Sequence, residues 1–248
     1  MLTIQSLSKK YKNSVWGIKD FDLTINNEEI MGIVGPNGSG KTTLINCLLG
    51  IITPTNGKVM LNGYPSKSKE FKQAIAYVPD DLILPEPLTG EEYLKFVTAM
   101  YEDIDQQKKS HLIELFNMQD ALSEPIETYS HGMKKKTQLI AAFMLKSKLV
   151  ILDEPFRGLD VEAIIITKKL MNRYVKQGGS ILLSTHDLIG AENLCNRVGI
   201  VSKGNKVAEG TVAELKSKHH SANLEEVFMK VALLNSRSEQ VEKILHHF

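Results

Sequence analysis

The segment GPNGSGKT, residues 35–42, has the residue types and spacing of a phosphate-binding loop. It fits the pattern G-x-x-x-x-G-K-[ST] and lies between an apolar run typical of a buried strand and a sequence typical of a helix, a context that a chance glycine-rich turn would rarely have. Glycines let the backbone turn tightly and point N–H groups inward, and the following helix adds its positive end. Lys41 can then reach the β- and γ-phosphates of a nucleotide, and the Thr42 hydroxyl can ligate Mg²⁺. The predicted phosphate-binding residues are Gly35, Pro36, Asn37, Gly38, Ser39, Gly40, Lys41, Thr42 and Thr43.

Two acidic residues follow another apolar run, KLVILDEP at residues 148–155. Because a buried strand would place them at its carboxyl end, Asp153 is predicted to hold Mg²⁺ through water, and Glu154 to polarise a water molecule for attack on the γ-phosphate. His186 ends a third apolar run, SILLSTH, and this position favours a contact with the γ-phosphate. The alternatives are two ordinary surface acids and a structural histidine. The predicted catalytic residues are Glu154, His186 and Lys41.

These residues need buried strands to position them. LTIQSL and FDLTI, within the first 25 residues, alternate in polarity, whereas EEIMGIVG and the two later runs are continuously apolar, as in buried parallel strands. GIVSKGNKVAEG predicts a hairpin that turns at Gly204-Asn205.

Helices are predicted between these strands. One follows the phosphate loop, three amphipathic segments lie between residues 80 and 146, and a longer helix runs from Asp160 to Gln177. Thr89 and Glu92 have the spacing of a capping box. Apolar strands that alternate with helices predict an α/β fold with a mainly parallel sheet, into which the block of helices at 80–146 is inserted.

The composition excludes several classes of protein. A net charge of +1, with lysine far more frequent than arginine, gives no field or guanidinium cluster for nucleic acid, so no nucleic-acid partner is expected. Cys47 and Cys195 are too few for a disulfide framework and are predicted to be small buried apolar residues in helices. No apolar stretch resembles a signal peptide or a membrane span, which predicts a cytoplasmic protein whose membrane role would depend on a partner.

Five segments in a fixed order resemble the nucleotide-binding subunit of an ABC transporter: GPNGSGKTT, YSHGM, LVILDEP, RGLD and STH. The resemblance covers about residues 1–220. It implies an ABC ATPase domain with a P-loop NTPase (RecA-like) core, an N-terminal antiparallel β subdomain and an inserted α-helical subdomain at about residues 81–146. Residues 221–248 are expected to form a C-terminal helical extension, and the role of the tail 231–248 is not assigned.

In that family two subunits sandwich ATP head to tail, and one supplies a signature sequence to the ATP that the other holds. The resemblance gives this role in trans to the Ser130 hydroxyl and to the N–H groups near Gly132. It also implies that Asp160 lies at the subunit interface, and that Tyr11 stacks on adenine, with Trp16 as a weaker rival. The signature residues implied are Ser130, His131, Gly132 and Met133.

Two positions depart from the pattern of the family. Asp80 occupies a position where the family usually has a glutamine that ligates Mg²⁺, and a carboxylate is also a good ligand for this ion. The metal ligands implied are therefore Thr42, Asp80 and Asp153. His131 replaces a glycine and would be strained if the position required a positive φ. The lysines at 134–136 are predicted to be solvated charges.

The YS-x-GM-K pattern and NLEEVFMK at 223–230 resemble the exporter ATPases that pair with six-helix permeases. The resemblance implies a motor subunit that binds ATP and Mg²⁺, forms a homodimer or heterodimer, and lies at the cytoplasmic face of the membrane through its permease. The cargo implied is a peptide, an antibiotic or another amphipathic compound. The alternatives are a soluble ABC ATPase, for example in iron–sulfur assembly, and a weakly hydrolysing ATP-dependent clamp.

Overall fold

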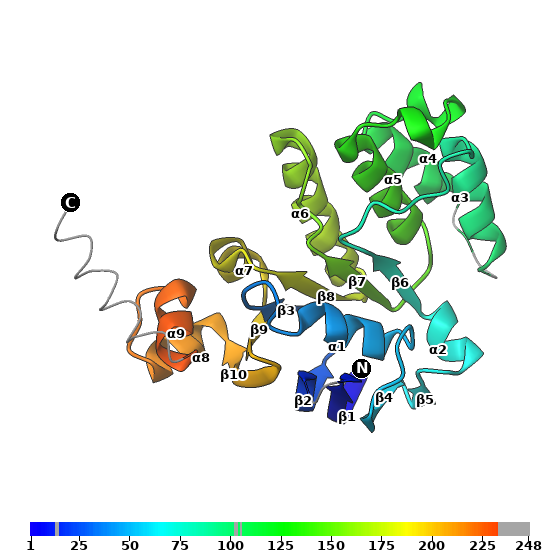
Figure 1. Cartoon of the computed structure of the whole chain (residues 1–248). Helices are drawn as coiled ribbons and strands as arrows, with labels where there is room; N and C mark the ends of the chain where they lie inside the picture. Colours follow the sequence, from blue (N-terminus) through cyan, green and yellow to red (C-terminus); the bar gives the residue numbers. More distant parts are fainter. Residues whose placement is uncertain (13–14, 102–103, 105, 233–248) are drawn as a thin grey trace. The chain divides into compact units, whose positions relative to one another are not determined.

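The computed structural model describes residues 1–12, 15–101, 104 and 106–232 (Figure 1). The chain divides into two compact units. Unit 1 comprises Met1–Thr3, Thr24–Glu29 and Met60–Leu183, and unit 2 comprises Ile4–Leu23, Ile30–Val59 and Ser184–Phe248. The division does not test the boundaries expected at residues 81, 146 and 220, which stay predictions.

Unit 2 is built on strands from distant parts of the chain. Strand β3 (Ile30–Val34) pairs in parallel with β9 (Arg197–Ser202), and β10 (Asn205–Thr211) pairs antiparallel with β9, which confirms the predicted hairpin. Most of β1 (Leu2–Lys10) and of its neighbour β2 (Trp16–Ile25) also belongs to this unit. The first part of β4 (Asn56–Leu61) lies here as well. The helices of unit 2 are α1 (Lys41–Leu48), α7 (Leu188–Leu194), α8 (Val212–Lys218) and α9 (Leu224–Val231).

Unit 1 contains most of the helical sequence. Its strands β6 (Ile75–Val78) and β7 (Leu149–Asp153) pair in parallel, and β8 (Ser180–Thr185), which begins in this unit, is the next neighbour of β7. The two residues of β5 (Tyr64–Pro65) pair antiparallel with the end of β4. The helices of unit 1 are α2 (Lys69–Gln73), α3 (Gly90–Ala99), α4 (Gln106–Leu115), α5 (His131–Phe143) and α6 (Val161–Lys176).

The core includes the apolar runs noted in the sequence. Every residue of β3, β7 and β8 is buried, as expected for strands that are covered on both faces. Phe143 of α5 contacts the Tyr174 ring of α6 edge to face, with the ring centroids 5.5 Å apart. The structure confirms the predicted α/β fold with an antiparallel sheet and a mixed sheet of largely parallel strands.

Local signals explain where several elements begin and end. Thr89 accepts a hydrogen bond from the Glu92 N–H, and Glu92 accepts one from the Thr89 N–H, so the predicted capping box is present at α3. The predicted block of helices begins only there, because residues 79–89 form an irregular segment. Helix α6 ends before Gly178, whose φ of +93° suits a residue without a Cβ atom.

The two cysteines are buried, as predicted, and burial raises the pKa of the Cys47 thiol to about 11 and that of Cys195 to about 12. Cys47 lies in α1, but Cys195 follows α7 in an extended conformation and is not helical. The helix predicted around Cys195 is α7, which ends just before it, whereas α2 was not predicted because it is too short to show a clear period of 3.6 residues.

Within the described ranges, no helix is both long enough and apolar enough to cross a bilayer. The described part of the C-terminal segment includes α9, which buries Leu224, Val227 and Phe228. The tail from residue 233 onward lies outside the described residues.

Candidate active site

The phosphate loop connects β3 to α1 in unit 2, and its glycines are required by close backbone contacts. A Cβ atom on Gly35 would lie 2.3 Å from the Val201 carbonyl oxygen, and one on Gly40 would lie 2.3 Å from the Gly17 carbonyl oxygen. Gly40 also has a φ of +115° and caps α1 without a side chain. The loop therefore presents backbone rather than side chains at the start of α1, as phosphate binding requires.

Two polar side chains of this loop are buried. Lys41 is 6% exposed, and its ammonium group donates to the Gly35 carbonyl at 2.7 Å and to the Pro36 carbonyl at 3.3 Å. The Ser39 hydroxyl is buried and has no hydrogen-bond partner within the described structure. Both groups fit a loop that closes around an anion. Phosphate oxygens could accept a hydrogen bond from the Ser39 hydroxyl and pair with the Lys41 ammonium.

Tyr11 is the aromatic residue that contacts the loop. Its hydroxyl lies 3.3 Å from Thr43 Oγ1, its ring borders Gly17, and its side chain is 43% exposed. Lysine ammonium groups lie near both aromatic rings: Lys9 is 5.6 Å from the Tyr11 centroid, and Lys10 and Lys19 are 5.3 and 5.9 Å from that of Trp16. The contact of Tyr11 with Thr43 favours Tyr11 over Trp16 for adenine stacking, which stays a prediction.

His186 lies where β8 passes into α7. It is exposed and directly follows the buried Thr185. The Asp187 N–H donates to Thr185 Oγ1 at 3.1 Å, and the Asp187 carboxylate caps α7 by accepting from the Gly190 N–H at 2.8 Å. The backbone on both sides of His186 is therefore held in place, as a strand-end phosphate contact needs.

The acidic pair of unit 1 ends strand β7. Asp153 is 2% exposed, whereas Glu154 is only partly buried and has a φ of +46°. A non-glycine residue in this left-handed region carries strain of about 1–3 kcal/mol, and such strain concentrates at functional sites. Burial, together with the negative charges of Asp153, Asp81 and Asp80, raises the pKa of Tyr77. Negative charge thus converges at the ends of β6 and β7.

The signature sequence begins helix α5. Ser130 is its N-cap and accepts a hydrogen bond from the Met133 N–H at 3.2 Å. His131 is the first helical residue and does not have a positive φ, so the strain considered for this position does not arise. Gly132 packs against the RGLD segment, since a Cβ atom there would lie 3.1 Å from the Gly158 carbonyl oxygen.

The three lysines after the signature are not simply solvated, and that prediction was wrong. Lys134 pairs with Glu86 at 2.9 Å and Lys136 with Asp160 at 3.1 Å. Lys135 is 1% exposed and donates to the carbonyls of Pro79 at 2.7 Å and Asp80 at 3.2 Å. Burial lowers the pKa of Lys135, although the charges of Asp80 and Asp153 oppose this shift. The three lysines contact three different segments of the chain, because successive residues of a helix point in different directions.

Asp80 occupies the irregular segment after β6, and one of its oxygens already has a cationic partner. Oδ2 lies 2.9 Å from Nη1 of Arg157, while Oδ1 is buried and has no hydrogen-bond partner within the described structure. A buried carboxylate oxygen without a partner is costly, and a hard divalent cation would satisfy it. Asp80 therefore fits the metal-binding role expected of it.

Three residues around Asp80 were missed from the sequence: Lys135, Gln138 and Arg157. Lys135 and Gln138 are three residues apart on the buried face of α5, so helical period could have assigned them to an interior face. The ion pair of Arg157 joins residues 77 positions apart, which no local pattern encodes.

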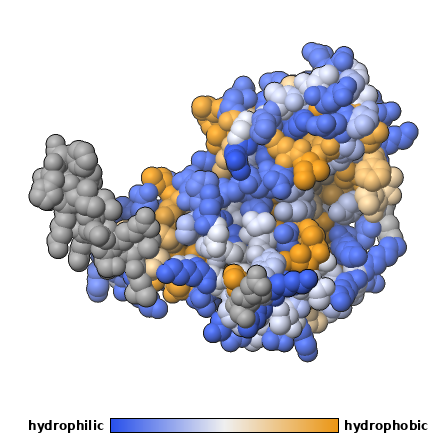
Figure 2. Space-filling model, viewed as in Figure 1, coloured by the Kyte–Doolittle hydropathy of each residue, from blue (hydrophilic) through white to orange (hydrophobic). Residues whose placement is uncertain are grey.

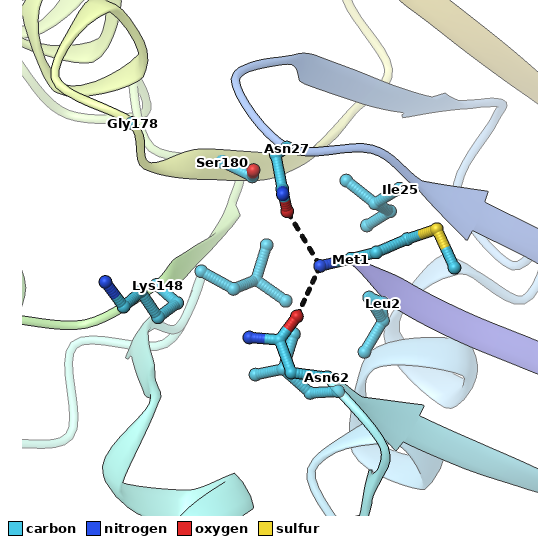
Figure 3. A pocket seen from close by; sticks show the side chains of 10 residues that line it. Met1, Leu2, Ile25, Asn27, Asn62, Lys148, Gly178 and Ser180 are labelled. Carbon is cyan, nitrogen blue, oxygen red and sulfur yellow. Dashed lines mark hydrogen bonds between the residues drawn. The ribbon is translucent and has the colours of Figure 1, made fainter.

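A cavity of about 200 Å³ in unit 1 lies outside all of these segments (Figure 3). There the Met1 amino group donates to the side-chain oxygens of Asn27 at 2.7 Å and Asn62 at 2.6 Å, and the Lys148 ammonium points away from it. The two asparagine side chains thus satisfy the Met1 amino group.

A family model described as ABC transporter matches residues 18–157, which is more than half of the chain. The chain belongs to the ABC transporter family. The linearmycin resistance ATP-binding protein LnrL of Bacillus subtilis (strain 168) is 31% identical over 227 residues, which cover 88% of this ABC protein and 71% of the relative. A solved structure of the ATP binding subunit of an ABC transporter matches with a TM-score of 0.87 and 31% identity, and covers 93% of this chain and 99% of that chain.

A more distant structure shares the fold of this ABC protein. The dimeric post-hydrolysis state of the ATP-binding cassette MJ0796, bound to ADP and Pi, matches with a TM-score of 0.75 and 20% identity, and covers 85% of this chain and 98% of that chain. The present chain is thus an ABC transporter ATP-binding domain and an ATPase of that family.

Proposed function

We propose that this ABC ATPase is the motor subunit of an exporter, and that it binds MgATP at a head-to-tail dimer interface. The observation that carries the proposal is the strained Glu154, held at a φ of +46° directly after the buried Asp153. Strain in the Glu154 backbone does not help to stabilise the fold. A strained residue next to the buried carboxylate of Asp153 therefore suits a role in orienting water.

The residues of the phosphate loop would bind the nucleotide. Backbone N–H groups of the loop from Gly35 to Thr43, Pro36 excepted, and the Lys41 ammonium would contact the phosphates, and Tyr11 would stack on the adenine. Thr42, Asp80 and Asp153 would hold Mg²⁺, which neutralises charge on the phosphate oxygens when it is bound.

Hydrolysis would depend on side chains at the ends of β7 and β8. Glu154 would orient or deprotonate the attacking water, and His186 would contact the γ-phosphate. Each role follows from the strand-end position that the residue has in its own unit.

A second ATPase subunit would complete each site. Ser130 and His131 are exposed at the start of α5, where helix N–H groups can attract an anion from another molecule. Asp160 would lie at the same interface, and the MJ0796 cassette is dimeric. The partner would be an identical or a related chain.

A membrane permease would bind an apolar groove of unit 1. The groove, of about 310 Å³, is lined by residues that include Pro79, Ile83, Phe96 and Met100, and its rim is exposed, with Ile83 84% exposed. Figure 2 shows hydrophobic surface over the region of α3 to α5. An exposed apolar patch beside Asp80 suits a helix or loop of a permease, which would hold the subunit at the cytoplasmic face of the membrane.

The proposed cargo is a peptide, an antibiotic or another amphipathic compound. LnrL, which is named for linearmycin resistance, supports this class. Purification of the membrane protein that binds the chain would test the assignment, and a chain that binds none would favour a soluble ABC ATPase.

Glu154→Gln tests the chemistry. The variant is expected to reduce ATP turnover by about 10²–10⁴-fold, the usual contribution of a general base, and to retain an ATP-bound dimer on size-exclusion chromatography. Glu162→Gln, at an exposed position in the first turn of α6, is the matched control and should keep the parental rate. A Glu154→Gln variant that hydrolyses ATP at the parental rate would show that the assigned role is wrong.

A further inference from the structure

Asp80 is held from two sides by groups that the reaction as proposed does not use. Its backbone lies in the segment after β6, which packs against α5 (Figure 1). The Lys135 ammonium binds the carbonyl oxygens of residues 79 and 80, and Gln138 Nε2 donates to the Asp81 carbonyl at 3.0 Å. Two side chains of one helix therefore bind three consecutive carbonyl groups, which fixes the path of the backbone at Asp80.

The side chain of Asp80 is fixed separately by Arg157. The Arg157 N–H donates to the Glu154 carbonyl at 3.2 Å, so Arg157 closes the turn that follows the acidic strand. From this turn its guanidinium reaches Asp80 Oδ2 at 2.9 Å. Oδ1 is buried and has no partner within the described residues. The two nearby cations contact other atoms of Asp80: Lys135 binds its carbonyl oxygen and Arg157 binds Oδ2.

We propose that Arg157 and Lys135 are positioning residues for Asp80, and that together they present its Oδ1 atom to the divalent cation that accompanies the nucleotide. Lys135 sets the backbone and Arg157 sets the rotamer. The inference rests on the proposed function, in which Asp80 is a metal ligand, and it explains how a carboxylate serves at this position. A free carboxylate could turn to solvent, whereas one whose second oxygen is bound by a guanidinium has a single oxygen left for the metal.

The same residues join Asp80 to the signature. Lys135 is five residues beyond Ser130 on α5, and the neighbouring Lys136 binds Asp160 at 3.1 Å. The metal ligand of one nucleotide site is thereby attached to the elements that would serve the partner's site. A movement of Asp80 on metal binding would be transmitted to the signature through α5 and to Asp160 through the turn at 154–157.

The test measures the Mg²⁺ concentration that half-saturates the ATP-dependent dimer of the full chain, by light scattering with a non-hydrolysable ATP analogue. Arg157→Ser should raise this midpoint about two- to fivefold, since an exposed ion pair contributes little and Arg157 is 72% exposed. Arg157→Lys keeps the charge but not the planar fork of the guanidinium, so its midpoint should lie between those of the parent and Arg157→Ser. An unchanged or lowered midpoint for Arg157→Ser, with normal dimerisation of the parent, would overturn the proposal.

A double-mutant cycle identifies the residue through which Arg157 acts. In an Asp80→Asn background, Arg157→Ser should have no further effect on the midpoint. The same shift in both backgrounds would mean that Arg157 acts elsewhere. A parent chain that forms no dimer at any Mg²⁺ concentration would instead count against the proposed function, and the two failures are thus distinct.

Lys135→Met tests the other side of Asp80. It removes the donor to two partly buried carbonyl groups, so the Mg²⁺ midpoint of the folded fraction should rise by about tenfold or more. Lys169→Met, at an exposed position of α6, is the control and should leave the midpoint unchanged. A purely structural role for Lys135 would lower the melting temperature without moving the midpoint of the folded protein, and that result would remove Lys135 from the proposal.

Discussion

The backbone strain at Glu154 leads to a prediction that reverses the usual order of alanine and glycine. Glu154→Ala and Glu154→Gly both remove the carboxylate, so any contact of that side chain is lost equally in the two variants. They differ only in backbone effects: the cost of a φ of +46°, which glycine adopts freely and alanine does not, and the larger entropy that glycine loses on folding. The comparison therefore isolates the contribution of the backbone at this position to the free energy of unfolding.

The expected difference follows from two opposing terms. Alanine in the left-handed region costs about 1–2 kcal/mol. Glycine loses about 0.5–1 kcal/mol more than alanine through the entropy of the unfolded chain. Glu154→Gly should thus be more stable than Glu154→Ala by about 0.5–1 kcal/mol. For a protein of this length, that difference corresponds to about 1–4 °C in melting temperature.

The assay is urea unfolding followed by circular dichroism, with thermal melting as a second measurement. The control pair is Glu162→Ala and Glu162→Gly in the first turn of α6, where alanine should be the more stable by about 0.5–1 kcal/mol. Opposite orders at the two positions support the reasoning. If glycine is as unfavourable at 154 as it is at 162, the strain at Glu154 does not contribute to the free energy of unfolding.

Three further predictions concern the phosphate loop, the hydrogen bond of Tyr174 and the titration of Tyr174. Gly40→Ala should weaken binding of a fluorescent ATP analogue at least about tenfold, because its Cβ atom would lie 2.3 Å from the Gly17 carbonyl oxygen. The control is Gly50→Ala: Gly50 also has a positive φ, +72°, but a Cβ atom there would have no atom within 4 Å, so this variant should bind normally. Equal binding by the two variants would contradict this account. Tyr174→Phe should cost about 1–3 kcal/mol in urea unfolding, because the Tyr174 hydroxyl donates to the Ser147 carbonyl at 2.8 Å. Burial raises the pKa of Tyr174 from 10.0 to about 12, so the unfolded chain loses this proton first and the parent loses stability as the pH rises from 10 to 12. The phenylalanine variant should lose less over that interval, and an identical alkaline slope would argue against burial as the cause.

Much of the fold could be predicted from the sequence because its signals are local. Continuous apolar runs gave β3, β7 and β8, and the capping box at Thr89 marked the start of α3. The short helix α2 was missed because five residues hold fewer than two full turns of a helix. The lysines at 134–136 were misjudged because sequence shows that a residue is charged, but not which segment its helix face meets.

The sequence by itself determined the family of this ABC protein and predicted its chemistry, because the phosphate loop, the acidic pair and the signature are contiguous motifs identified by their residue types and order. Only the tertiary structure decided how Asp80 is held, that His131 is unstrained, and that Glu154 adopts a left-handed backbone conformation. The physical reason is the separation along the chain of the residues that interact. Loop and helix-start chemistry depends on neighbours along the chain, whereas burial, ion pairing and strain depend on segments that meet only after the chain has folded.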